Sequence, residues 1–178
     1  MAAIKVWDPV VRVFHWSLVV GFTANALFTD AESALHEWVG YGIGALILAR
    51  ILWGLIGTRH ARFTDFPPSV GGAMGQLAEI ASARRRAHVG HSPLGALMIY
   101  NLLATILAIC VTGYMMTTLA FFGVEWVEEV HEALVSWAEL SVALHIAAVV
   151  FESRRLGINL PKSMVTGYKT MKDDRTSA

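Results

Sequence analysis

The chain has 178 residues, of which 55% are hydrophobic and only 16% are charged, and its formal net charge at pH 7 is zero. Soluble domains carry about 25% charged residues, so this composition disfavours an ordinary soluble domain, and the balanced charge gives no reason to expect a nucleic-acid partner. The single cysteine, Cys110, excludes a disulfide framework and any motif that needs paired thiols.

The apolar residues fall in long blocks, each able to cross the roughly 30 Å hydrocarbon core of a bilayer as a helix. The first span is predicted over about 9–28, where Asp8 is a good N-cap and Pro9 a good first helical residue. The second span is predicted over about 35–56. These two blocks place the first membrane hairpin in the N-terminal third of the chain.

The first block has an alternative interpretation as a cleaved signal peptide. The tripeptide Ala24-Asn25-Ala26 resembles a cleavage site, and the apolar stretch before it is short. Against cleavage, Asp8 lies in the N-terminal region and His15-Trp16 precede the apolar stretch. Cleavage would leave three spans and an odd number of histidines within them.

The connection 57–91 is too long for a simple turn and is broken by Pro67-Pro68. Its stretch 70–86 is predicted to be a short interfacial helix with apolar residues along one side. The arginine triplet Arg84-Arg85-Arg86 would then meet anionic lipid headgroups. A solvated basic loop is the alternative interpretation.

The third span is predicted over about 93–117, after Ser92 as a cap, and the fourth over about 128–151. Tryptophans near the ends of the spans are interpreted as interfacial aromatics. They are Trp7, Trp38, Trp53 and Trp126.

The basic residues predict the orientation of the spans. The connections 29–34 and 118–130 contain no Lys or Arg, whereas 13 of the 14 basic residues lie in the N-terminal stretch, the connection 57–91 and the tail. The last one, Arg50, lies within the second span. The positive-inside rule then places both termini in the cytoplasm. The sequence therefore predicts an all-α, integral membrane four-helix bundle, a single domain over 1–178 with both termini cytoplasmic.

Four histidines lie in these apolar spans, where an ionisable side chain is costly and usually functional. His131 and His145 are fourteen residues apart, close to four helical turns, so they share a helix face about 21 Å apart. Antiparallel neighbours pair by depth, which matches His15 with His145 on the cytoplasmic side and His36 with His131 on the outer side.

One imidazole on each side of a planar macrocycle is the arrangement that holds a haem between two helices. Because the chain lacks paired cysteines, the natural cofactor is haem b, held by coordination and packing alone, and the two pairs predict two such groups. With both axial positions filled, the iron transfers electrons and does not bind oxygen.

Small residues follow the second-span histidine on the same face. Gly40 and Gly44 come four and eight residues after His36 and would leave flat space for a macrocycle. The alternative is that they merely allow close helix packing.

Charged and polar residues near the histidines have several interpretations. Arg50 is placed at the depth of the inner pair, where a haem propionate would supply its counter-charge. Arg12, one turn before His15, could bind a propionate or a lipid phosphate. His91 could contact a propionate or a quinone headgroup, or be a surface histidine. Glu139 could be protonated, pair with Asn101 or Asn25, or belong to a proton path.

These motifs together resemble a known family. They are Trp7-Asp8…Arg12…His15-Trp16, His36…Gly40…Arg50…Trp53-Gly54…Gly57, Gly90-His91-Ser92-Pro93, His131-Glu132…His145 and Leu160…Met164…Thr166-Gly167-Tyr168-Lys169. Over nearly its whole length the chain resembles the bacterial di-haem b-type cytochromes, which include cytochrome b561 and the cytochrome b subunits of nickel hydrogenases and formate dehydrogenases.

The resemblance implies a four-helix bundle in the bacterial inner membrane with two haem b groups on His15, His36, His131 and His145. It implies electron exchange in a respiratory chain between a quinone, ubiquinone or menaquinone, and a periplasmic redox partner. The hydrogenase-associated members usually carry one more transmembrane helix than this sequence does. That departure favours a compact cytochrome that serves a soluble c-type cytochrome or acts alone.

Two other functions compete with this interpretation. The protein could itself be an oxidoreductase that takes electrons from a small species such as superoxide at the outer pair and passes them to quinone, although an acidic outer face does not attract an anion. It could also be a non-redox protein whose histidines bind zinc. Zinc prefers four ligands at one site, and these histidines are predicted to lie in two distant pairs.

Overall fold

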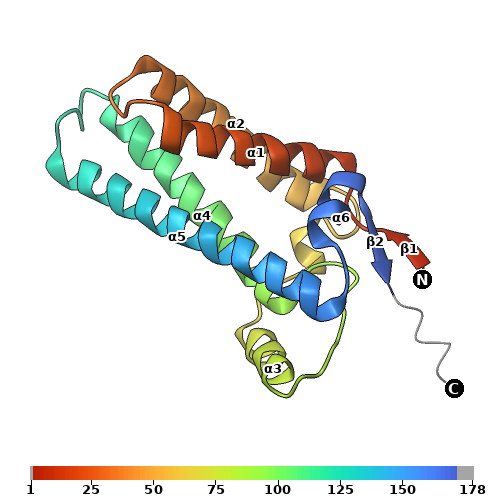
Figure 1. Ribbon diagram of the computed structural model, residues 1–178. Coiled ribbons are helices and arrows are strands. Elements are labelled where there is room, and N and C mark those ends of the chain that lie inside the picture. Colours follow the sequence, from red (N-terminus) through yellow and green to blue (C-terminus); the bar gives the residue numbers. More distant parts are fainter. Residues whose placement is uncertain (1, 172–178) are drawn as a thin grey trace, which may run out of the picture.

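The computed structural model describes residues 2–171 and shows long helices running side by side (Figure 1). The long helices are α1 (Pro9–Phe28), α2 (Ala34–Ile56), α4 (Pro93–Met116) and α5 (Glu125–Leu156). The shorter elements are β1 (Ala2–Lys5), the 3₁₀ turn η1 (Phe63–Asp65), α3 (Val70–Ala81), α6 (Leu160–Thr166) and β2 (Tyr168–Met171). All four long helices are long and apolar enough to cross a membrane, so the predicted all-α membrane bundle is confirmed.

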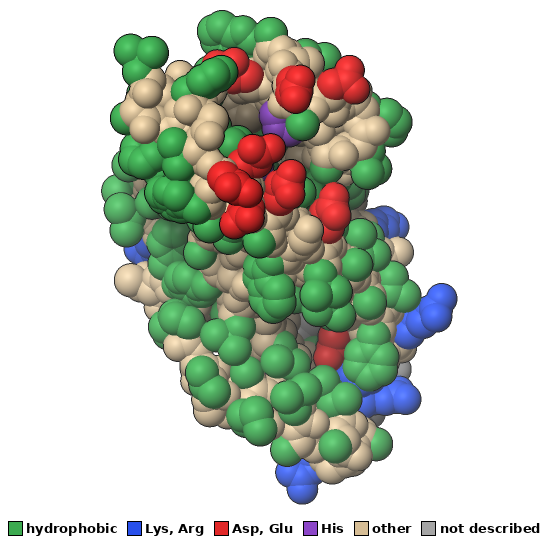
Figure 2. All heavy atoms as spheres, turned by 90° about the vertical axis from the view of Figure 1, so that its left-hand side faces the viewer, with side chains coloured by type: hydrophobic (Ala, Val, Ile, Leu, Met, Phe, Trp, Pro, Cys, Tyr) green, Lys and Arg blue, Asp and Glu red, His purple; other side chains and the backbone are tan. Residues whose placement is uncertain are grey.

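Exposed hydrophobic side chains cover much of the outside of the bundle, and many of them are visible in Figure 2. Large examples on three different spans are Val20, Leu52 and Leu144, which are 67%, 62% and 53% exposed. In water such a surface would be unstable, but lipid tails cover it without cost. The exposed belt therefore marks the part of the molecule that lies in the bilayer.

Side-chain caps fix where the spans begin. The Asp8 carboxylate accepts a hydrogen bond from the Val11 amide at the start of α1, as expected for an aspartate before a helical proline. Ser33 and Ser92 cap α2 and α4 in the same way. Because these caps are local, the first three spans begin within one residue of the predicted positions.

Two helix bounds differ from the prediction. The fourth span was predicted over 128–151, but α5 runs from Glu125 to Leu156 and ends at Gly157, whose φ of 68° lies in the left-handed region. Hydropathy detects only the apolar middle of such a helix, whereas acidic residues in its first turn and arginines in its last suit the helix dipole. The interfacial helix was predicted over 70–86, but α3 ends at Ala81, before the arginine triplet.

The spans pack in a row rather than all against each other. Within residues 2–171, α1 packs on α2, α2 on α4, and α4 on α5, and no comparable packing joins α5 to α1 or α2. Ile43, Ile47 and Ile106 form the buried core between α2 and α4. The α5 helix therefore lies farther from α1 and α2 than the packed neighbours in the row lie from each other.

A short two-stranded ribbon joins the two ends of the described chain. β1 pairs with β2 antiparallel, with Lys5 opposite Tyr168. Neither this ribbon nor α6 was predicted from the sequence. We call the end of the bundle at which α1 begins and α5 ends the basic end, and the opposite end, which carries the α1–α2 and α4–α5 connections, the acidic end (Figure 1).

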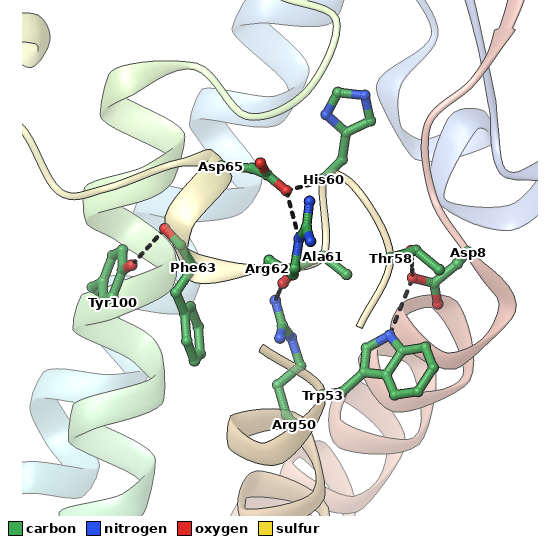
Figure 3. Close-up of polar contacts among 10 residues, drawn as sticks. All are labelled: Asp8, Arg50, Trp53, Thr58, His60, Ala61, Arg62, Phe63, Asp65 and Tyr100. Atoms are coloured by element: carbon green, nitrogen blue, oxygen red, sulfur yellow. Dashed lines mark hydrogen bonds and ion pairs between the residues drawn. The ribbon is translucent and has the colours of Figure 1, made fainter. Parts of the chain in front are cut away.

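At the basic end, a cluster of hydrogen bonds ties α1 to the connection after α2 (Figure 3). The Asp8 carboxylate accepts from the Trp53 indole at 3.2 Å and from the Thr58 hydroxyl. Burial alone would raise the pKa of Asp8, but these bonds and the bond from the Val11 amide outweigh it and lower the pKa. Asp8 is therefore ionised at neutral pH and holds the two segments together.

The predicted interfacial tryptophans divide into two kinds. Trp38 and Trp126 are 71% and 53% exposed, as expected for aromatics at a membrane surface. Trp7 is only 6% exposed and donates to the Ser163 hydroxyl at 3.2 Å, while Trp53 bonds Asp8. The interfacial interpretation is wrong for Trp7, which is buried, whereas Trp53 is half-buried and its indole N–H makes a tertiary hydrogen bond.

Candidate functional site: two histidine pairs

The structure brings the four span histidines together as two pairs. At the basic end, His15 of α1 lies close enough to His145 of α5 to interact with it electrostatically. At the acidic end, His36 of α2 and His131 of α5 are related in the same way. All four side chains are half-buried. Each pair thus joins α5 to one of the helices against which α5 does not pack closely.

Two threonines contact the rings of the acidic-end pair through Nδ1. The Thr112 hydroxyl hydrogen-bonds His131 Nδ1 at 2.9 Å and also donates to backbone carbonyls of its own helix. Likewise, the Thr29 hydroxyl hydrogen-bonds His36 Nδ1 at 3.2 Å and the Asn25 carbonyl. These bonds engage Nδ1, and Nε2 is the nitrogen available to a metal when Nδ1 carries the proton.

Glycines shape the space beside this pair. A Cβ atom added at Gly113 would lie only 3.2 Å from His131 Cε1, so a larger residue there would press on the ring. A Cβ at Gly40 would meet nothing within 4 Å, which fits the predicted flat space on the histidine face. Gly44 instead packs against the Cys110 side chain, so at this position the packing interpretation holds.

The basic end gathers buried nitrogen atoms that have no hydrogen-bond partner within residues 2–171. They are Arg12 Nε, His15 Nδ1, Arg50 Nη1 and His91 Nδ1. Buried polar atoms are nearly always paired, so each unpaired one requires an explanation. Two belong to guanidinium groups, which can only donate, and the set therefore suits a group that presents anionic or acceptor oxygens.

The described part of the chain holds no cluster of three or more His, Cys, Asp or Glu side chains that could bind a metal ion. A structural zinc site needs four ligands at one place. The four histidines instead occur as two pairs at opposite ends of the bundle.

Comparison with known proteins identifies the family. The family model of prokaryotic cytochrome b561 matches residues 6–167. The chain belongs to the prokaryotic cytochrome b561 family. No curated protein and no solved structure matched the chain. Family membership together with four apolar helices makes this protein a multi-pass bacterial membrane protein that transfers electrons across the membrane through haem.

In this cytochrome Arg50 has a different setting from the simple one predicted. Its side chain is only 4% exposed, and its Nη2 donates to the Ala61 carbonyl at 3.0 Å (Figure 3). The guanidinium also lies over the Phe63 ring, 5.1 Å from the ring centroid. The Arg50 Nη2 group therefore holds the connection after α2, and the unpaired Nη1 group remains available to another acceptor.

His91 is an enclosed residue of the cytochrome, so its interpretation as a surface histidine is wrong. Its ring lies between those of Trp7 and Phe66, at centroid distances of 4.6 and 4.2 Å. Burial, together with the nearby cations Lys169 and Arg50, lowers the pKa of His91 to about 3. His91 is therefore neutral at physiological pH and can offer one N–H.

Arg12 faces the C-terminal segment of the cytochrome. Its Nη1 donates to the Thr166 carbonyl at 3.3 Å, and the neighbouring Trp16 indole donates to the Met164 carbonyl at 3.4 Å. Thus α6 lies along the first turns of α1, beside His15. This position brings the Arg12 side chain under the chain's own tail.

Glu139 lies on the exposed surface of α5. The Asn101 amide donates to Ser141 at 2.9 Å and accepts from the Trp137 indole at 3.0 Å, while Thr29 hydrogen-bonds Asn25. Both asparagines thus have other partners, and the pairing of Glu139 with either one is not formed within residues 2–171.

Thr29 and Thr112, which hydrogen-bond two of the histidines, were not predicted from the sequence as site residues. A threonine in an apolar helix is usually explained by a bond to its own backbone, and both residues also make that bond. Their contact with histidine depends on the neighbouring helix, so no spacing in the sequence could indicate it.

Proposed function

We propose that this cytochrome b561 carries electrons between the two membrane surfaces through two haem b groups. His15 and His145 would hold one group at the basic end, and His36 and His131 the other at the acidic end. The observation that carries the proposal is the pairing of half-buried histidines between α5 and its neighbours, with two of the rings held by threonines through Nδ1. When bound, haem would supply one-electron redox chemistry, with two histidines holding each group.

The unpaired nitrogens of the basic end give the protein its hold on the basic-end haem. Arg50 Nη1, Arg12 Nε and the His91 ring would donate to the propionates, which present the anionic oxygens that these donors lack. A buried guanidinium without a carboxylate is costly, so the propionate and the arginine stabilise each other. Gly40 would give the acidic-end macrocycle its flat surface.

Two haem b groups per chain are expected in the purified protein. The measurement is a potentiometric titration followed by absorption, combined with haem extraction to give the stoichiometry. The expected result is two one-electron transitions of low-spin haem and two haems per chain. A colourless protein, or one that saturates with a single haem, would contradict the proposal.

We further propose that the protein lies in the bacterial inner membrane with its basic end in the cytoplasm. The positive-inside rule supports this orientation, because residues 13–49 and 87–153, which include both connections of the acidic end, contain no Lys or Arg. A quinone, ubiquinone or menaquinone, would exchange electrons beside one of the haems.

The acidic end is the proposed docking face for a basic redox protein, such as a soluble c-type cytochrome. Figure 2 shows carboxylates gathered around a histidine at this end. The exposed acidic residues here are Asp30, Glu32, Glu37, Glu125, Glu128, Glu129 and Glu132. Such a field speeds encounter with a positively charged partner and repels an anion, so it favours this partner over superoxide as the electron source.

Electron exchange with a lysine-rich cytochrome c is expected to slow as salt rises, because salt screens the attraction between the two proteins. Replacing Glu125, Glu128 and Glu129 by Gln should lower the second-order rate at low salt about tenfold or more and flatten its salt dependence. Stopped-flow absorption gives both quantities, and Glu79→Gln at the basic end is the control. A rate that is independent of salt and unchanged in the triple variant would rule out this docking face.

A further inference from the structure

A lysine near the C-terminus is buried without a carboxylate partner. The Lys169 side chain, on β2, is only 6% exposed, and its Nζ donates to the backbone carbonyls of His88 at 3.2 Å and Gly90 at 2.8 Å. The ammonium also lies over the Trp7 ring, 5.2 Å from the ring centroid. No salt bridge to Lys169 is formed within residues 2–171. Burying a cation in this way is costly and suggests that the charge itself has a use.

The tail that carries this lysine forms one wall of the basic-end site. Ser163 accepts from the Trp7 indole, Thr166 accepts from Arg12, and Met164 accepts from Trp16. These contacts follow the chain from Trp7, just before α1, to Trp16, next to His15. The tail therefore holds the lysine at a fixed place next to the proposed haem site rather than in solvent.

Trp7 connects the lysine to the unpaired nitrogens of that site. The Trp7 ring contacts both the Lys169 ammonium and, at a centroid distance of 4.6 Å, the His91 ring. Lys169 and Arg50 both act electrostatically on His91, whose Nδ1 is one of the unpaired atoms. The lysine thus adds a second buried positive charge behind the donors that face the proposed propionates.

We propose that Lys169 is a positioning residue whose buried positive charge, acting together with His91, raises the reduction potential of the basic-end haem. The inference rests on the proposed function, since it needs a haem between His15 and His145. A fixed positive charge in a poorly solvated region stabilises the reduced haem, which carries one more electron than the oxidised haem. Lys169 contributes to this without touching the group.

The charge and the structural role of the lysine can be separated by two substitutions. Lys169→Met keeps a long apolar stem without the charge, and Lys169→Arg keeps the charge. Lys5, exposed on the paired strand β1, provides the control Lys5→Met, which removes one positive charge from the same ribbon surface. Potentiometric titration measures both haems, and the same substitutions in a His131→Ala background identify the basic-end transition.

Lys169→Met is expected to lower the equilibrium constant for reducing the basic-end haem about tenfold, which is about 59 mV for one electron. The acidic-end haem is expected to be unchanged, as are both haems in Lys169→Arg and Lys5→Met. An unchanged basic-end potential in Lys169→Met, or an equal shift of both haems, would overturn the inference. A chain that holds fewer than two haems before any substitution would instead contradict the proposed function.

The pH dependence gives a second test that needs no loss of charge by mutation. Burial lowers the pKa of Lys169 to about 8, so the wild-type ammonium loses its proton as the pH rises through that value. Of the groups around it, His60, His88 and His91 have lowered pKa values and are neutral in this range, while Arg50 stays charged and Asp8 stays ionised. The basic-end potential should therefore fall between pH 7 and 9 in the wild type more than in Lys169→Arg. Equal slopes in the two proteins would overturn the inference even if Lys169→Met did not fold.

Discussion

Replacing His145 by Ala is expected to leave a protein that holds one haem instead of two. The substitution removes the α5 ligand of the basic-end pair, while His36 and His131 keep their threonine bonds at the other end of the bundle. The histidines of α5 are about 21 Å apart along the helix, so loss of one site leaves the other intact. Haem extraction should give half the wild-type stoichiometry, and the titration should show one transition.

Replacing the other histidine of α5, His131, gives the complementary test. His131→Ala should keep the haem that His145→Ala loses, so the two single-haem proteins should show the two different wild-type midpoint potentials. His88→Ala, a histidine of the basic end outside both pairs, should bind two haems. Loss of both haems in either ligand variant, or retention of both, would contradict the assignment of the pairs.

Replacing Gly40 by Leu is expected to expel the acidic-end haem. Gly40 is one helical turn after His36, and its missing side chain leaves a half-buried open space within which a Cβ would meet no atom. A leucine would occupy the space proposed for the macrocycle. In the helix itself, leucine is more favourable than glycine by about 1 kcal/mol, so the loss should be of haem and not of fold.

Gly42 provides a matched control for this substitution. It lies two residues further along α2, a Cβ there also meets nothing within 4 Å, and it is exposed on the lipid-facing side. Gly42→Leu should therefore bind two haems, while Gly40→Leu binds one. Circular dichroism shows whether both variants keep their helices, and haem extraction gives the number of haems that each one binds. Equal haem content in the two proteins would show that the macrocycle does not lie against Gly40.

The spans and the histidine pairing could be predicted because the features that fix them are local or periodic. Helix starts depend on caps such as Asp8 and Ser92, which act within three residues. The pairing depends on depth, which follows from the position of each histidine in an antiparallel span. Where hydropathy was the only guide, as at the ends of α5, the predicted bounds were short by several residues.

The contacts of the basic end could not be predicted. Trp7 and Trp53 have the sequence context of interfacial aromatics, yet they bond Ser163 and Asp8, which are 156 and 45 residues away in the chain. The ribbon of β1 and β2 joins two segments of four residues each, too short for a period to reveal them. Such contacts depend on which chain segments lie next to each other, and the packing of the spans determines this.

By itself, the sequence determined the membrane bundle, its four spans and the depths at which histidines occur, because hydropathy, caps and helical period act along the chain. Only the tertiary structure decided that Thr29 and Thr112 hydrogen-bond two of the histidine rings and that Arg50 Nη2 donates to the Ala61 carbonyl. It also decided that Lys169 is buried near His91. The physical reason is that hydrogen bonds and burial between distant segments depend on how the helices and the tail pack against each other, and no local pattern records that packing.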